Sequence, residues 1–254
     1  MVETNATRQP GSFSRSLATA AATVSGNTYL ILGSLLFSVL SILGAWIPPR
    51  GNWVFQMARL WSQGLLFFSG VRLDVDYVEP LSSNQCCIYM SNHQSLFDIP
   101  ALIVSLPGQT RLLAKQSLFR IPIFGWAMKA GGFISIDRKN RSKAKESFDA
   151  AVLRLREGSS TLVFPEGTRS LDGRLQPFER GGFLLALKSG LPIVPVGVIG
   201  SMAIRRRGSY VVRPGRITVR YGRPLRVEDF GVRGKQDLTQ RVREEIAILA
   251  GLEP

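Results

Sequence analysis

The sequence predicts an α/β fold with a largely parallel sheet flanked by helices, preceded by an N-terminal membrane-embedded hairpin of two helices. After residue 70, short apolar segments alternate with segments of helical periodicity, which is typical of domains built on parallel strands. Before that point, residues 28–47 contain no charged side chain. We therefore expect a flexible tail at 1–26, a membrane-associated two-helix segment at 27–70 and an α/β domain at 71–254.

The expected tail is rich in Ser, Thr and Ala and contains two arginines and one glutamate. It lacks the basic and apolar regions that define a secretory signal. A disordered segment is the favoured interpretation, and a transit peptide is the alternative.

The expected hairpin begins with TYLILGSLLFSVLSILGAWI, residues 28–47. A helix of this length spans about 30 Å, which matches the hydrocarbon core of a bilayer. The second segment, 53–70, combines tryptophans with one polar face, as helices at a membrane interface do. Its alternative is a core helix of the following domain. Two full spans or a re-entrant hairpin in one leaflet would both leave that domain on the side where the chain began.

The α/β domain is expected to contain short strands separated by helices. Residues 72–78 alternate polar and apolar side chains, and several later segments are short and apolar. Strands are expected at 72–78, 86–90, 111–115, 132–137, 161–164 and 191–200, with a hairpin at 209–222 around Pro214 and Gly215. Helices are expected at about 95–105, 117–129, 142–156 and 235–250.

Composition and charge limit the function classes. Hydrophobic residues make up 45% of the chain and charged residues 20%, which excludes disorder for most of it. The net charge of +14 falls entirely within residues 101–254, so that half is expected to bind an anionic partner, such as nucleic acid, phospholipid headgroups or a phosphorylated substrate. One histidine and two adjacent cysteines, Cys86 and Cys87, offer neither a zinc site nor a disulfide framework.

His93, the only histidine, lies in the segment NHQSLFD directly after the expected strand 86–90. Sheets of α/β proteins bind ligands at the carboxyl ends of their strands. Asp98, five residues later, is placed to accept the Nδ1 proton and leave Nε2 as a base toward a hydroxyl group. The alternative is a capping or solvated histidine beside an aspartate in the first turn of a helix.

Strand ends also carry candidate anion ligands. In FPEGTRS, residues 164–170, Gly167 permits a tight turn, and Glu166 and Arg169 lie at its rim. A guanidinium group binds a phosphate through two parallel hydrogen bonds. Arg138 ends the expected strand 132–137, and Lys115 ends 111–115. The alternatives are a turn with a surface ion pair and a solvated basic face.

Four blocks of the sequence resemble the glycerolipid acyltransferase family, and within it the 1-acylglycerol-3-phosphate acyltransferases. They are NHQSLFD at 92–98, GGFISIDR at 131–138, FPEGTRS at 164–170 and IVPVGV at 193–198. The resemblance covers about 71–230 and implies the acyltransferase type of αβ domain. One departure is Ser135, where many members carry Phe or Pro, and it bears on acceptor preference.

The resemblance implies a role for each matched residue. His93 would deprotonate the sn-2 hydroxyl of lysophosphatidic acid, which then attacks the thioester of acyl-CoA or acyl-carrier protein, and Asp98 would orient His93. Cys86 and Cys87 are then buried strand thiols rather than nucleophiles. No cofactor and no metal are implied beyond the acyl donor. The implied substrate-binding residues are Lys115, Arg138, Glu166, Gly167, Thr168 and Arg169, supported by Asn92 and Pro195.

The remaining arginines, including IRRRGS at 204–209, are expected to form a diffuse cationic surface that attracts anionic lipid. The alternative use of this surface is to bind an acidic carrier protein or the phosphates of CoA. The expected partners are the bilayer, lysophosphatidic acid and the acyl donor, without nucleic acid. The expected location is the membrane, on the cytoplasmic face of the inner or plasma membrane if the source is bacterial. The alternatives are acylation of another lyso-lipid (lyso-ornithine lipid or a lysophospholipid), or an inactive membrane-tethered protein that binds anionic lipid or nucleic acid.

Overall fold

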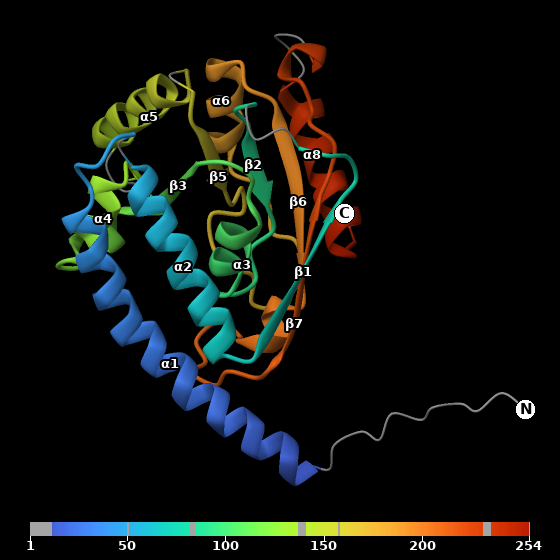
Figure 1. Ribbon diagram of the computed structural model, residues 1–254. Helices are drawn as coiled ribbons and strands as arrows, with labels where there is room; N and C mark the ends of the chain where they lie inside the picture. The colour runs from blue at the N-terminus through green and yellow to red at the C-terminus, as the bar shows by residue number, and fades with distance from the viewer. Residues whose placement is uncertain are drawn as a thin grey trace, which may run out of the picture.

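The protein folds into a central sheet with helices on both faces (Figure 1). The structure is a computed structural model that describes residues 12–49, 51–81, 85–136, 141–156, 158–230 and 235–253. In these ranges the sheet has seven strands in the order β1-β7-β6-β2-β5-β3-β4. The strands are β1 Val71–Tyr77, β2 Ile88–Ser91, β3 Thr110–Lys115, β4 Ile134–Ile136, β5 Ser160–Val163, β6 Ile193–Ile199 and β7 Gly215–Tyr221.

The sheet is largely parallel, which confirms the predicted fold class. Every neighbouring pair of strands is parallel except β6 and β7. All residues of β2 and β5 are buried, as expected for strands covered on both faces. In register, Met90 of β2 lies opposite Val163 of β5, so these two strands end at the same edge of the sheet.

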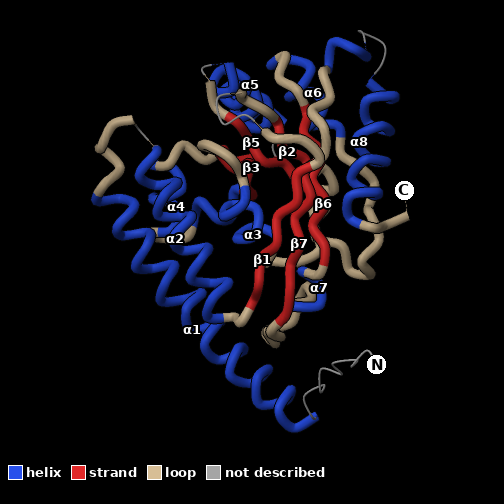
Figure 2. The backbone as a smooth tube through the Cα atoms, turned by 45° about the vertical axis from the view of Figure 1, so that its right-hand side comes forward, coloured by secondary structure: helices blue, strands red, loops and turns tan. Residues whose placement is uncertain are grey.

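Two hydrophobic clusters cover the two faces of the sheet. Along β2, Tyr89 belongs to one cluster, while Ile88 and Met90 belong to the other, as the two-residue period of a strand requires. Figure 2 shows α1 and α2 on one side of the sheet and α8 on the other. The helical segments of the domain are α3 Asp98–Ser105, η1 Gln116–Arg120, α4 Phe124–Ala130, α5 Arg141–Arg156, α6 Arg180–Ser189, α7 Ser201–Ile204, η2 Val227–Phe230 and α8 Lys235–Ala250.

The N-terminal helices differ in part from the expectation. Helix α1 spans Ser12–Leu43, so residues 12–26 are helical, and the prediction of a tail up to residue 26 is wrong for them. The predicted tail residues 1–11 lie outside the described residues. The segment Phe13–Leu43 is long and apolar enough to cross a membrane, with large apolar side chains exposed. Membrane association stays a prediction.

Helix α2, Asn52–Phe68, packs on the domain with one face. Its buried residues include Phe55, Leu65 and Leu66, and Arg59 donates hydrogen bonds to the carbonyl oxygens of Ile103 and Leu106 around the end of α3. This is the core-helix packing of the alternative interpretation. Phe67 and Phe68, the last two residues of the helix, remain exposed.

Two further elements differ from the sequence-based expectation. The expected hairpin at 209–222 is wrong, because only Gly215–Tyr221 forms a strand, which pairs with β1 and β6. The backbone of Val212 instead exchanges hydrogen bonds with the Thr23 hydroxyl of α1. Helix α6 was not predicted, because its first turn contains the glycines Gly181 and Gly182, which weaken a helical pattern.

Close packing of β6 on α8 gives a first testable prediction. A Cβ at Gly197 would lie 2.4 Å from the backbone carbonyl carbon of Leu249 and 2.5 Å from the backbone nitrogen of Ala250. Gly197→Ala is therefore expected to lower the free energy of unfolding by about 1–3 kcal/mol, measured by denaturant titration of the detergent-solubilised protein. Gly181→Ala is the matched control, because a Cβ there meets nothing within 4 Å. Equal denaturation midpoints for the two variants would contradict this packing.

Candidate active site

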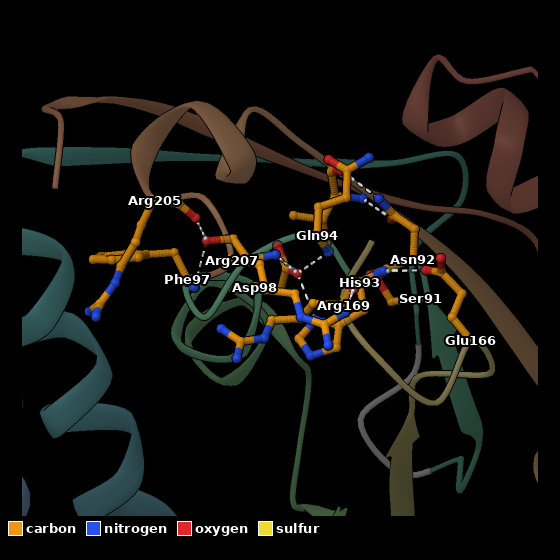
Figure 3. Close-up of polar contacts among 12 residues, drawn as sticks. Ser91, Asn92, His93, Gln94, Phe97, Asp98, Glu166, Arg169, Arg205 and Arg207 are labelled. Atoms are coloured by element: carbon orange, nitrogen blue, oxygen red, sulfur yellow. Dashed lines mark hydrogen bonds and ion pairs between the residues drawn. The ribbon is translucent and has the colours of Figure 1, made fainter. Parts of the chain in front are cut away.

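The candidate site lies where the loops after β2 and β5 meet. His93 follows β2 by two residues, and Phe164 directly follows β5. The backbone N–H of Ser170 donates to the carbonyl oxygen of His93 at 2.7 Å, which joins the two loops. Figure 3 shows His93, Asp98, Glu166 and Arg169 gathered at this edge of the sheet. The sheet therefore brings two sequence-distant motifs together.

His93 and Asp98 are in hydrogen-bond contact. The distance from His93 Nδ1 to Asp98 Oδ2 is 2.8 Å, and the same oxygen accepts the backbone N–H groups of Gln94 at 2.7 Å and Ser95 at 2.8 Å. Asp98 is fully buried in the first turn of α3. Backbone N–H donors and the helix N-terminus both stabilise a carboxylate. Asp98 therefore orients the imidazole ring of His93 and stabilises the turn before α3.

The other ring nitrogen of His93 remains available. The ring stacks on Phe164, with centroids 3.9 Å apart and an interplanar angle of 18°. The side chain is 13% exposed, and no described residue forms a hydrogen bond with Nε2. An N–H at Nδ1 that donates to Asp98 leaves Nε2 unprotonated and free to accept a proton. Phe164 fixes the plane of the ring, a contact that the sequence did not suggest.

Glu166 accepts hydrogen bonds from two backbone N–H groups. Its Oε1 accepts the N–H of His93 at 2.6 Å, and its Oε2 accepts the N–H of Gln176 at 2.8 Å. The residue is 4% exposed. Burial raises the pKa of the Glu166 carboxyl group, and the hydrogen bonds from Gln176 and His93 act in the opposite direction. Glu166 therefore fixes the position of the backbone that carries His93.

Removal of the Glu166 carboxylate is expected to disturb the loop that carries His93 more than it disturbs acceptor binding. Glu166→Ala leaves two partly buried N–H groups without partners and is expected to cost about 2 kcal/mol of unfolding free energy. We expect kcat to fall while the KM for the acceptor changes little, measured in steady-state assays beside denaturant titration. Glu166→Gln retains one acceptor oxygen, and its loss should be intermediate. A variant with wild-type stability and a raised acceptor KM would instead place Glu166 in the acceptor pocket.

Two supporting residues of the motifs have structural contacts. The Asn92 side chain donates to the carbonyl oxygen of Val198 at 2.9 Å and accepts its N–H at 2.7 Å, which fastens the end of β2 to β6. Pro195 lies within β6, opposite Met90, and its carbonyl oxygen accepts the N–H of Gly222. Both residues therefore position the strands beneath His93.

The candidate anion ligands that the structure describes lie at the same edge of the sheet. Gly167 has a φ of 70° and closes the turn with its N–H on the carbonyl oxygen of Phe164. Thr168 is exposed and Arg169 half-buried in that turn. Lys115 is exposed at the end of β3, two strands from β2. Arg138, the remaining candidate, lies outside the described residues.

Sequence reasoning missed a third loop at the site, which follows α7. The Ser95 hydroxyl donates to the carbonyl oxygen of Arg205 at 2.7 Å, and Arg207 Nη1 donates to the carbonyl oxygen of Arg169 at 2.7 Å. The arginine run IRRRGS was expected to form a diffuse surface. Its charges indicated an anionic partner, but its distance from His93 along the chain gave no indication that it lies at the site.

Cys87 is not suited to nucleophilic chemistry. It is 3% exposed, and burial raises the pKa of its thiol to about 11. A thiol rather than a thiolate is then present at neutral pH, and the thiol is the poorer nucleophile. Among the side chains that the structure describes, no group of three His, Cys, Asp or Glu residues is placed to hold a metal ion.

Comparison with solved structures shows the fold. The chain superposes on the 1-acyl-sn-glycerophosphate acyltransferase PlsC of Thermotoga maritima with a TM-score of 0.80, covering 93% of this chain and 96% of that one. The sequence identity is 21%. The likeness extends over nearly the whole of both chains.

Comparison with curated proteins shows the family. The chain is 35% identical over 171 residues to 1-acyl-sn-glycerol-3-phosphate acyltransferase BAT2 of Brassica napus, covering 66% of this chain and 49% of that protein. It is 30% identical over 213 residues to the alpha enzyme of Bos taurus, covering 84% and 74%. The chain spans about half the length of BAT2 and of a second similar plant relative, LPAT1 of Arabidopsis thaliana. The family model described as Acyltransferase matches residues 72–199, and the chain belongs to this acyltransferase family.

Proposed function

We propose that the protein transfers a fatty acyl group from acyl-CoA or acyl-carrier protein to the sn-2 hydroxyl of 1-acylglycerol 3-phosphate, giving phosphatidic acid. The names of its relatives support this acceptor. The observation that carries the proposal is the His93–Asp98 pair, 2.8 Å apart, with Nε2 left open. A base in this form is what the acylation of a hydroxyl group requires.

The chemistry follows from the two ring nitrogens. Nε2 of His93 accepts the proton of the sn-2 hydroxyl while the hydroxyl oxygen attacks the thioester carbonyl carbon. The C–S bond then breaks, and the imidazolium returns its proton to the departing thiolate. Asp98, through Oδ2, stabilises the imidazolium between these steps. The acyl group passes directly from sulfur to oxygen, so no protein nucleophile is needed.

Cationic residues at the same edge of the sheet support a phosphate-bearing acceptor. Arg169 belongs to the loop that bonds to the backbone of His93 through Ser170. Lys115 and Arg138 are proposed as further phosphate ligands, together with Gly167 and Thr168 of the turn. Guanidinium groups suit phosphate because they offer two parallel donors. The phosphate would hold the acceptor so that its hydroxyl reaches Nε2.

The proposed site of action is a bilayer surface. Exposed apolar side chains of α1, among them Leu32, Leu35 and Leu36, favour contact with lipid. The acceptor and product are themselves bilayer lipids, so a membrane-bound enzyme meets them without releasing them to water. A cytoplasmic face is proposed if the source is bacterial.

A panel of acceptors tests the proposed function. Purified protein is incubated with a labelled acyl thioester and, separately, with 1-acylglycerol 3-phosphate, a lysophospholipid with a substituted phosphate, lyso-ornithine lipid and 1-monoacylglycerol. We expect transfer to 1-acylglycerol 3-phosphate to be the fastest. Faster transfer to another acceptor would assign that lyso-lipid instead. Transfer to none, with lipid or nucleic acid still bound, would indicate an inactive binding protein.

A further inference from the structure

Three arginines from two loops near His93 lie close enough for their charges to interact. Arg169 comes from the loop after β5, and Arg205 and Arg207 come from the loop after α7. Figure 3 shows Arg169 and Arg207 near His93 and Asp98, and Arg205 farther out with its side chain directed away from His93. We refer to Arg169, Arg205 and Arg207 as the arginine cluster. Arg207 and Arg169 are in hydrogen-bond contact although they lie 38 residues apart in the sequence.

Hydrogen bonds hold the loop after α7 in this place. The carbonyl oxygen of Arg205 accepts the Ser95 hydroxyl at 2.7 Å, so the loop is tied to the segment between His93 and Asp98. The Arg205 guanidinium donates to the carbonyl oxygen of Ser209 at 2.8 Å and to the Asn27 side chain of α1 at 3.2 Å. The position of the cluster is therefore set by the fold.

The cluster lacks a counter-charge among the described residues. No ion pair joins Arg169, Arg205 or Arg207 to a described carboxylate. Burial lowers the pKa of Arg205, and the positive charge of Arg169 lowers it further.

Three arginines on β7 and shortly after it are paired with carboxylates instead. Arg216 pairs with Asp74, Arg220 with Asp76 and Arg223 with Glu79. Adjacent cations without a carboxylate repel one another, and a bound anion would relieve that repulsion. A group of neighbouring cations of this kind is suited to an anionic ligand.

We propose that Arg207 completes, together with Arg169 and beside the charge of Arg205, a phosphate-binding cluster of the active site. The inference rests on the proposed function and assigns it one ligand outside the matched motifs. The ligand chemistry is a phosphate group. It can come from the phosphomonoester of the acceptor or from the phosphates of an acyl-CoA donor. Arg207 is the residue to test, since Arg205 also holds the loop.

Arg207→Gln removes the charge and keeps a donor for the carbonyl oxygen of Arg169, whereas Arg207→Lys keeps the charge. Arg206→Gln is the matched control, because the exposed Arg206 lies between the two cluster residues in the sequence. Steady-state assays measure KM for 1-acylglycerol 3-phosphate, KM for acyl-CoA and kcat. We expect Arg207→Gln to raise the acceptor KM about tenfold, as for a lost charge-assisted hydrogen bond. Arg207→Lys should recover most of this loss, and Arg206→Gln should stay near the wild-type values.

The other outcomes separate the sources of the phosphate from a structural role. A rise in the acyl-CoA KM alone supports the cluster and assigns it to the donor phosphates. Wild-type values for Arg207→Gln, or an equal loss of kcat in Arg207→Gln and Arg207→Lys with both KM values unchanged, would overturn the inference and leave the proposed function standing. If the wild-type protein transfers no acyl group, the proposed function fails first. Binding of short-chain 1-acylglycerol 3-phosphate to the wild-type protein and to Arg207→Gln then tests the cluster by itself, and equal affinities reject it.

Discussion

His93→Ala is expected to lower kcat by about 10²–10⁴-fold, the range that general acid–base catalysis contributes. The variant loses Nε2, which is the proposed base, while Asp98 keeps its hydrogen bonds from the backbone of Gln94 and Ser95. The fold and acceptor binding should therefore persist. The measurement is the initial rate of phosphatidic acid formation at saturating substrates, beside the acceptor affinity of the variant.

Two controls make the result for His93 specific. The unfolding midpoint of His93→Ala should remain close to that of the wild type, because the lost side-chain contacts are the bond to Asp98 and the stack on Phe164. Added imidazole should restore part of the rate, since the vacated space lies between the same neighbours. A kcat of wild-type size in His93→Ala would show that another group removes the proton.

Asp98→Asn is expected to lower kcat by about 10²-fold or more, with the acceptor KM nearly unchanged. Asp98 Oδ2 receives hydrogen bonds from His93, Gln94 and Ser95, while no group of the described residues bonds to Oδ1. An asparagine can place its carbonyl oxygen at the Oδ2 position and keep these donors. The substitution therefore removes the negative charge and retains the geometry.

Asp98→Ala provides the comparison, because it removes both the charge and the acceptor oxygen. It should lower the unfolding free energy as well as kcat, since two backbone N–H groups lose their partner. Full activity in Asp98→Asn, combined with inactivity in Asp98→Ala, would mean that Asp98 only positions the loop. The charge would then have no part in stabilising the imidazolium.

The sequence predicted the fold class because its signals are local. Buried runs such as β2 and β5 and the long apolar segment of α1 are visible without tertiary information. The hairpin at 209–222 failed for the opposite reason. Alternation in that segment resembles a strand, but the backbone of Val212 is satisfied by Thr23, which lies 189 residues away.

The sequence predicted which residues form the candidate site better than it predicted their contacts. The five-residue spacing predicted that His93 and Asp98 could meet across one loop. In the structure, His93 Nδ1 lies 2.8 Å from Asp98 Oδ2. The motif around Glu166 does not indicate which way the carboxylate points, and its partners are 73 and 10 residues away. Arg205 is joined to the site by the hydrogen bond from Ser95, which lies 110 residues away in the sequence. Such contacts depend on strand order, which short motifs do not encode.

A single-turnover experiment tests whether the acyl group passes directly to the acceptor with His93 as the base. Protein mixed with a labelled acyl thioester and 1-acylglycerol 3-phosphate is quenched at short times, and both the lipids and the intact protein are analysed by mass spectrometry. The account predicts labelled phosphatidic acid acylated at sn-2 with the wild type, almost none with His93→Ala, and no acyl adduct on the protein at any time. An acyl adduct that passes its label to the lipid, or equal product from both proteins, would contradict direct transfer with His93 as the base.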